Sequence, residues 1–198
     1  MNVTGLVLAA GGSRRLGRPK QLLPYRGTTL LGWTLATARD CGFDQLLVTL
    51  GGAAEAVRRQ VDLTGVQVLD NPEYGTGCGT SVSSGVRAID PAADGLVLLL
   101  GDQPGVTAES VRRLVEAAGE APIGVSRYAD GLGHPFWFGR QVFGDLTTLH
   151  GDKAVWKLLH SGRHPVTQVR RDGTVPIDVD TWEDYRTLLS YDETGVTS

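Results

Sequence analysis

The chain has 198 residues, of which 41% are hydrophobic, 21% charged and 7% aromatic, a length and composition that suit one α/β domain with a substantial core and argue against disorder. Its 19 Lys and Arg are outnumbered by 22 Asp and Glu, which disfavours nucleic-acid binding as the main role, because general nucleic-acid binders are basic. The sequence shows no apolar run of membrane-spanning length, no signal-peptide pattern and no metal-ligand spacing of Cys41 and Cys78, so we expect a cytoplasmic protein with reduced thiols.

The first half of the chain alternates apolar runs with helical patterns. Its strands are continuous apolar runs that end in glycine or Asp-Asn-Pro turns, and either Thr28 or Thr29 is placed to cap the first helix. In chain order, we predict a strand at residues 5–10, a helix from 28 or 29 to 41, a strand at 46–50, a helix at 53–61, a strand at 66–69 and a helix at 80–89.

The second half continues the alternation. Residues 96–100 are an unbroken apolar run, which is typical of a central parallel strand. Thr107 is a predicted helix N-cap, with Ser110 where a capping box would have Glu. The remaining predictions are strands at 123–126 and 136–138, helices at 140–149, 152–160 and 182–190, and a frayed tail beyond Asp192.

Strands that alternate with helices predict an α/β fold of three layers, Rossmann-like, with a mostly parallel sheet and helices on both faces. Neither an internal repeat nor a linker-like stretch divides the sequence, so we expect a single domain over residues 1–198. Ligands of such sheets bind at the carboxyl ends of the strands. Three loops begin there, at residues 10–20, 71–81 and 101–104.

The loop after the first predicted strand combines glycines with three arginines and a lysine. Residues 8–24 read Leu-Ala-Ala-Gly-Gly-Ser-Arg-Arg-Leu-Gly-Arg-Pro-Lys-Gln-Leu-Leu-Pro. Glycine N–H groups can cradle phosphate oxygens and the cations can neutralise a triphosphate, whereas the alternative is a solvated basic turn. Arg18-Pro19 stands where a P-loop needs Lys-Ser/Thr, and no Gly-x-Gly-x-x-Gly occurs, so neither a P-loop ATPase nor an ordinary nicotinamide site is predicted.

Residues 8–24 resemble the Leu-Ala-Ala-Gly-x-Ser-x-Arg-Met-Gly-x-Pro-Lys-x-Leu-Leu-Pro signature of nucleotidyltransferases, with Leu16 in place of Met. The most similar branch is the molybdenum cofactor cytidylyltransferases, within a group that includes molybdopterin guanylyltransferases and sugar-phosphate nucleotidyltransferases. Further matches run along nearly the whole chain, at residues 101–104, 133–135, 149–152 and 178–185. The resemblance implies a fold of the nucleotide-diphospho-sugar transferase type.

The resemblance also implies an activity, namely Mg²⁺-dependent transfer of CMP from CTP to a phosphorylated pterin, the molybdenum cofactor, with release of pyrophosphate. Leu8-Ala-Ala-Gly11 matches the cytidylyl branch, whereas the guanylyl branch usually has Leu-Ala-Gly-Gly. The alternatives are GTP or another NTP with a different phosphorylated acceptor, a non-catalytic molybdopterin-binding chaperone and, more remotely, a flavin or nicotinamide reductase. A molybdoenzyme is an expected protein partner, and neither nucleic acid nor membrane is.

Acidic residues supply the expected metal ligands. Asp102, at the end of the central strand, is the best metal ligand by position. Alternatively, its side chain caps a helix or stabilises a turn. Alternation along a strand would put Asp178 and Asp180 on one face. We favour Asp178 as the second ligand and leave Asp180 open between catalysis and capping of the last helix.

The other expected site residues follow from the matched motifs. The expected catalytic residues are Lys20, Arg15 and Asp102, the first two through phosphate contacts. The nucleotide-binding residues are Leu8, Ala9, Ala10, Gly11, Gly12, Ser13, Lys20, Asn71, Gly75 and Ser81. The acceptor-binding residues are Gln103, His134, Pro135 and Asp152.

Some residues near these motifs depart from the family pattern. Arg14 and Arg18 fall on its variable positions, so we expect them on the surface. Cys78 lies at a helix start but has no adjacent His or second Cys, so no nucleophilic role is expected. Ala154 and Trp156 replace a glycine and an arginine of the acceptor motif, which leaves the acceptor less defined than the donor.

Overall fold

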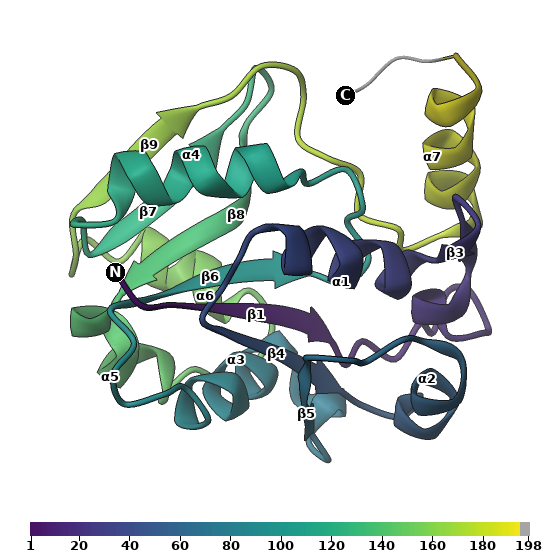
Figure 1. Ribbon diagram of the computed structural model, residues 1–198, viewed down its shortest axis with the longest axis horizontal. Helices are drawn as coiled ribbons and strands as arrows, with labels where there is room; N and C mark the ends of the chain where they lie inside the picture. Colours follow the sequence, from purple (N-terminus) through teal and green to yellow (C-terminus); the bar gives the residue numbers. More distant parts are fainter. Residues whose placement is uncertain (195–198) are drawn as a thin grey trace.

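The structure, a computed structural model, describes residues 1–194 and the side chains of residues 1–191. Its main sheet has seven strands in the order β5-β4-β1-β6-β8-β7-β9 (Figure 1). All neighbouring strands pair in parallel except β8, which is antiparallel to both β6 and β7. The strands are β1 (Val3–Ala9), β4 (Gln45–Leu50), β5 (Gln67–Asp70), β6 (Gly95–Leu100), β7 (Ile123–Arg127), β8 (Leu132–Gly139) and β9 (Val166–Arg170).

Helices cover both faces of this sheet, as the alternation of elements predicts. The helices are α1 (Leu30–Asp40), α2 (Ala54–Gln60), α3 (Cys78–Arg87), α4 (Ala108–Ala118), α5 (Phe143–Leu146), α6 (Ala154–Leu159) and α7 (Trp182–Thr194). Short elements complete the chain: η1 (Lys20–Leu22), η2 (Tyr74–Thr76), η3 (Arg140–Val142) and a hairpin of β2 (Pro24–Tyr25) and β3 (Thr28–Thr29). None of the helices in residues 1–194 is both long and apolar enough to cross a bilayer.

Alternate residues of the central strands enter two separate cores. In β1, Leu6 belongs to the cluster formed with α3, α5 and α6, whereas Val7 belongs to the cluster formed with α1, α2 and α4. Both side chains are fully buried, which explains why this strand reads as a continuous apolar run. A third, smaller cluster packs α7 and the β2–β3 hairpin together at one side of the molecule (Figure 1).

The structure resolves the capping predictions. Thr29, rather than Thr28, caps α1, and its hydroxyl accepts a hydrogen bond of 3.0 Å from the Gly32 N–H. Thr107 caps α4, and Ser110 completes a reciprocal capping box in place of the usual Glu.

Several predicted boundaries were wrong. The sequence did not reveal β9, which is a half-exposed edge strand with a weak apolar pattern, nor the two-residue strands of the hairpin. The strand expected at 136–138 is part of the longer β8, and the helix expected at 140–149 is broken into η3 and α5. α7 continues beyond the expected start of fraying to Thr194, and the rest of the tail lies outside the described residues.

The strand order places the switch point of the sheet between β1 and β6. From β1 the chain moves outward through β4 and β5 and then returns to β6 on the other side of β1. In open α/β sheets a crevice forms at such a point, at the carboxyl ends of the strands. The ends of β1 and β6, Ala9 and Leu100, therefore mark the expected ligand site.

Candidate active site

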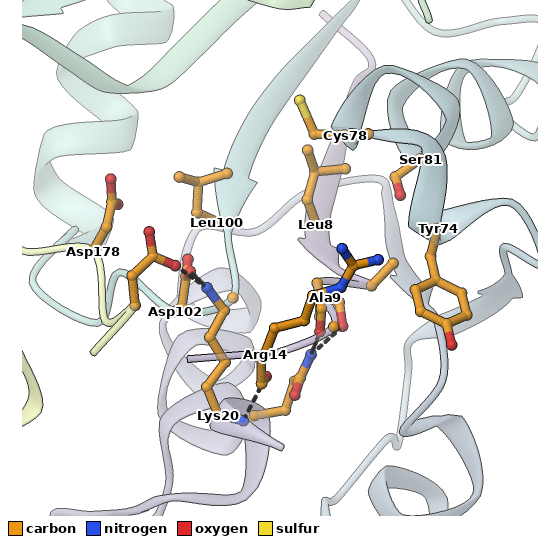
Figure 2. Close-up of a pocket in the computed structure, with 18 of the residues that line it drawn as sticks. Leu8, Ala9, Arg14, Lys20, Tyr74, Cys78, Ser81, Leu100, Asp102 and Asp178 are labelled. Atoms are coloured by element: carbon orange, nitrogen blue, oxygen red, sulfur yellow. Dashed lines mark hydrogen bonds and ion pairs between the residues drawn. The ribbon is translucent and has the colours of Figure 1, made fainter. Parts of the chain in front are cut away.

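A pocket of about 510 Å³ lies at the carboxyl ends of β1 and β6, a size in the range of small-ligand sites. It joins the first loop, the loop before α3, the end of β6 and the segment before α7. Figure 2 shows Lys20, Asp102 and Asp178 at one end, Tyr74, Cys78 and Ser81 at the other, and Ala9 between them. The predicted residues that line it are Leu8, Ala9, Ala10, Gly11, Gly12, Ser13, Arg15, Lys20, Gly75, Ser81, Asp102, Asp152 and Asp178.

The first loop owes its shape to side chains that bind its backbone. The buried Gln21 donates through Nε2 to the carbonyl oxygens of Ala9 at 2.7 Å and Gly11 at 3.1 Å. Ser13, with φ of 50°, accepts a hydrogen bond of 2.9 Å at Oγ from the Lys20 N–H. These three hydrogen bonds tie the two ends of the loop to each other and fix the path of its backbone.

Two cations and two carboxylates form a charged network at one end of the pocket. Lys20 Nζ makes ion pairs with Asp102 Oδ2 and, at 2.8 Å, with Asp180 Oδ1. Arg15 pairs with the other oxygen of Asp180 at 2.8 Å. Burial lowers the pKa of Lys20, but the charges and hydrogen bonds of Asp102 and Asp180 more than reverse this, so its pKa is raised and the side chain is an ammonium.

Asp178 lies beside this network and lacks an ion-pair partner within the described residues. Desolvation and the negative charges of Asp102 and Asp180 raise the pKa of its carboxyl to about 7. The expected strand geometry was wrong, because residues 174–180 form no strand. Asp178 and Asp180 nevertheless both line the pocket. Val179, which lies between them in the sequence, is buried.

The structure decides against Asp180 as the cap of α7. Thr181 takes that place, since its hydroxyl accepts a hydrogen bond of 3.2 Å from the Asp184 N–H. The Asp184 carboxylate in turn accepts from the Thr181 N–H at 2.7 Å and from the Asp180 N–H at 3.1 Å. The Asp180 side chain is left to the ion pairs with Lys20 and Arg15.

The donor set fits a divalent cation that is shared with a substrate. Within the described residues, no group of three or more His, Cys, Asp or Glu side chains is arranged to hold a metal alone. Mg²⁺ does not require such a group, because it commonly takes one or two carboxylates, phosphate oxygens and waters. Asp102 and Asp178 supply two carboxylates, and a bound cation would offset the desolvation and the neighbouring negative charges that raise the pKa of Asp178.

At the opposite end of the pocket, Ser81 is fixed by Asn71. The buried Asn71 does not line the pocket but donates through Nδ2 to Ser81 Oγ at 2.8 Å and to Thr80 Oγ1 at 3.0 Å. Tyr74 lies against a glycine pair, because a Cβ at Gly51 would approach its Cγ to 2.7 Å and one at Gly52 its hydroxyl to 2.6 Å. Asn71 thus fixes the Ser81 hydroxyl at this end of the pocket, and a side chain at Gly51 or Gly52 would collide with Tyr74.

Two chain segments that are distant in sequence meet at the start of α3. The Gly79 N–H donates to the Gly151 carbonyl at 3.1 Å, and a Cβ at Gly77 would overlap the Gly151 backbone. This contact brings Asp152 of the expected acceptor motif to the pocket wall. Burial raises the pKa of the Cys78 thiol in the same region, which disfavours the thiolate a nucleophile needs.

Three of the expected acceptor residues do not line the pocket. Gln103 is 1% exposed and donates to the Pro176 carbonyl at 2.8 Å. His134 and Pro135 belong to β8, and burial lowers the pKa of His134 to about 3, so its imidazole is neutral. The His134 ring stacks against Phe136 with centroids 4.0 Å apart. Their roles toward an acceptor remain predictions.

Sequence reasoning missed three conspicuous residues of the pocket. Arg14, expected on the surface, is exposed but lines the pocket, and no described residue pairs with it (Figure 2). Gln21 and Tyr74 also line it. The position of Gln21 directly after Lys20 was a usable signal, whereas the contact of Tyr74 with Gly51 and Gly52 depends on the tertiary fold.

A model of the MobA-like NTP transferase domain matches residues 5–167 of the chain. The chain belongs to this nucleotidyltransferase family. It is 33% identical over 195 residues to the purine catabolism protein PucB of Bacillus subtilis, covering 91% of this chain and 93% of PucB. It is also 37% identical over 128 residues to nicotine blue oxidoreductase of Paenarthrobacter nicotinovorans, covering 64% of this chain and 62% of that protein.

Solved structures resemble the chain along nearly its whole length. Rv0371c from Mycobacterium tuberculosis is 57% identical with a TM-score of 0.91, over 96% of this chain and 98% of that one. A second structure of Rv0371c, described as a complex with manganese, is 54% identical with a TM-score of 0.88, over 96% and 99% of the two chains. Nucleotidyltransferases less than 25% identical share the fold, which confirms the predicted nucleotide-diphospho-sugar transferase type.

Proposed function

We propose that the protein transfers CMP from CTP to the phosphate of a molybdenum cofactor pterin, with Mg²⁺ as the metal and pyrophosphate as the second product. The observation that carries this proposal is the convergence of Lys20, Asp102 and Asp178 beside the glycine loop at the switch point of the sheet. Cations and metal ligands are needed together where a triphosphate reacts. The family membership supports the same reaction class.

In the proposed reaction, an oxygen of the acceptor phosphate attacks the α-phosphorus of CTP. The bond from that phosphorus to the oxygen bridging the β-phosphate breaks, and pyrophosphate leaves with the bonding electrons. Asp102 and Asp178 would hold Mg²⁺, which supplies electrostatic stabilisation of the phosphate charge. Lys20 and Arg15 would neutralise the phosphates, and the glycine loop would place the α-phosphate for attack.

The opposite end of the pocket would bind cytosine and ribose. Ala9 and Ala10 border this space, and Ser81 presents a hydroxyl held by Asn71. We propose that the Ala10 side chain limits the space beside the base, so that the smaller cytosine is accepted in preference to guanine. Backbone groups at Gly75 complete the nucleotide site in this proposal.

We propose that the acceptor approaches past Asp152, with Gln103, His134 and Pro135 shaping its site from beneath. The aromatic Trp156 stands where the family motif has an arginine, and its ring lies 5.3 Å from Phe136, edge to face. This change removes a cation from the acceptor side, and the Trp156 ring also stacks on His160 with centroids 6.1 Å apart. The product would pass to a molybdoenzyme, and the reaction would take place in the cytoplasm.

Identification of the product tests the proposal. Incubation with CTP, Mg²⁺ and reduced molybdopterin should add the mass of CMP to the pterin, as read by mass spectrometry. Asp102→Asn should lose this product, whereas Asp70→Asn, outside the pocket and paired with Arg58, should retain it. A CMP adduct on a different phosphorylated acceptor would contradict the pterin assignment and keep the transfer reaction, and absence of any adduct would favour a non-catalytic pterin-binding role.

A second candidate is a redox function, favoured only by the likeness to nicotine blue oxidoreductase. It would require a bound redox cofactor or a nicotinamide substrate. The absorption spectrum of the purified protein and its rate of NAD(P)H oxidation distinguish this candidate from nucleotidyl transfer.

A further inference from the structure

The ammonium of Lys20 occupies the centre of the acidic end of the pocket. It makes ion pairs with Asp102 and Asp180 together, and only 13% of the Lys20 side chain is exposed. Asp102 is one of the carboxylates that the proposed function assigns to the divalent cation. A metal ion and an ammonium cannot both lie against the same carboxylate oxygen without strong repulsion. The Lys20 ammonium thus contacts a carboxylate oxygen that the proposed metal ion would also need.

The same ammonium also lies within reach of the glycine loop. A Cβ added at Gly11 would be 3.5 Å from Lys20 Cε and 3.9 Å from Nζ. The Lys20 backbone is anchored by its N–H to Ser13 Oγ, whereas the four-carbon side chain can rotate about its own bonds. A triphosphate bound by the loop would compete with Asp102 and Asp180 for this one cation.

We propose that Lys20 is a place-holder cation, which fills the metal site of the nucleotide-free protein and moves to the triphosphate when the nucleotide and the metal bind. The proposal rests on the proposed function in that a nucleoside triphosphate is the ligand that draws the ammonium away. Departure of Lys20 frees the Asp102 carboxylate, which can then hold the divalent cation together with Asp178. Nucleotide therefore raises the affinity for metal, and metal raises the affinity for nucleotide by the same factor.

Arg15 provides the matched control for this position. It also contacts Asp180, at 2.8 Å, but its side chain is 65% exposed and it makes no contact with Asp102. Removal of either residue deletes one positive charge near the carboxylates. Only the removal of Lys20 vacates the metal site itself. If the lost positive charge acted only through general electrostatics, the two variants would gain similar affinity for the metal ion. If Lys20 is a place-holder, only the Lys20 variant gains substantial affinity.

The test is binding of Mn²⁺ alone, measured by the loss of the free-ion EPR signal at fixed pH, without acceptor or turnover. We expect Lys20→Met to bind Mn²⁺ about tenfold more tightly than the wild type, a typical coupling between linked sites. Arg15→Met should change the affinity far less. The double variant Lys20→Met/Asp102→Asn should lose this gain in Mn²⁺ affinity, because the vacated site needs the Asp102 carboxylate.

Nucleotide dependence completes the test. A non-hydrolysable CTP analogue should tighten Mn²⁺ binding to the wild type about tenfold and to Lys20→Met much less. Lys20→Gln, which retains a hydrogen-bond donor, should behave as Lys20→Met does, and circular dichroism verifies that both variants are folded.

Two results would overturn the proposal: Mn²⁺ affinity of both lysine variants no higher than that of the wild type, or equal gains in the lysine and Arg15 variants. Failure of every triphosphate analogue to tighten Mn²⁺ binding would also contradict it. A response to the GTP or ATP analogue but not to the CTP analogue would instead contradict the proposed donor, while it supports the place-holder role of Lys20.

Discussion

The proposed function assigns the choice of nucleotide to a few small pocket residues at the end of β1, Ala9 and Ala10 among them. Ala10 lines the pocket and is 5% exposed, and its carbonyl oxygen lies beside Gly51. Loss of one methyl group at this position would enlarge the space for the base. The proposed donor preference can therefore be tested at a single residue.

We predict that Ala10→Gly lowers the ratio of kcat/KM for CTP to that for GTP by roughly tenfold, the scale of discrimination that one methyl group provides. Steady-state kinetics with both nucleotides measure this ratio. Ala93→Gly, at a buried position outside the pocket, should leave it unchanged. An unaltered ratio in Ala10→Gly would show that the base is selected elsewhere.

A second residue-scale prediction concerns Asp178, whose pKa is raised from 3.8 to about 7. A raised pKa means that the folded state binds the proton more tightly than the unfolded state, so the stability that the protonated carboxyl provides is lost as pH rises through about 7. Asp178→Asn removes this loss. In metal-free buffer, the free energy of unfolding of Asp178→Asn minus that of the wild type should therefore increase from pH 4 to pH 8. We expect an increase on the order of 1 kcal/mol, because solvent screens the charges in the open pocket.

Urea unfolding with EDTA at several pH values measures this difference. Asp130→Asn, at a carboxylate outside the pocket that accepts a hydrogen bond of 2.8 Å from the Val175 N–H, serves as a control for the general effect of removing a charge. A pH-independent difference between Asp178→Asn and the wild type would mean that the Asp178 carboxyl titrates normally.

At the scale of elements, the contact between the start of α3 and the turn before α6 joins the donor side of the pocket to Asp152. Gly77 has φ of 116°, and a Cβ there would overlap the Gly151 backbone. Gly75, two residues earlier, has no atom within 4 Å of an added Cβ. The two glycines thus form a matched pair in one loop.

We predict that Gly77→Ala destabilises the protein by about 2 kcal/mol, through backbone strain and displacement of the 149–152 turn. Gly75→Ala should change the free energy of unfolding by less than about 0.5 kcal/mol. Thermal or urea unfolding compares the two variants. Equal losses of stability would mean that the 149–152 turn does not depend on close packing against Gly77.

An element can be predicted from the sequence when its own residues carry the signal, such as an apolar run or a capping residue. β1 and β6 are continuous apolar runs because both of their faces are buried, and Thr29 and Thr107 carry local capping signals, so these elements are readable. The edge strand β9 is half exposed and carries no comparable pattern. The break between η3 and α5 likewise lacks a local signal in the sequence.

The same distinction applies to the site. The motif of residues 8–24 identifies Lys20 and Arg15, and Asp102 follows from its place after β6. The ion pair of Lys20 with Asp180, 160 positions away, depends on how α7 packs. For the same reason, the sequence could not decide between capping and pocket roles for Asp180, and the backbone contacts of Thr181 and Asp184 did.

At the scale of the whole molecule, five segments that are separate in the sequence meet at one pocket beside the switch point between β1 and β6. One end carries cations and carboxylates, and the other carries Ser81, held by Asn71. This polarity suits a nucleotide whose triphosphate and base lie at opposite ends. We propose that this one pocket performs nucleotidyl transfer with CTP as the donor.

The most direct test is release of pyrophosphate with CTP, GTP, ATP and UTP in turn, each with Mg²⁺ and reduced molybdopterin, for the wild type and Asp102→Asn. Our account predicts release with CTP in the wild type, much less with the other three nucleotides, and none in the variant. Release that is equal for all four nucleotides, or that persists in Asp102→Asn, would contradict it.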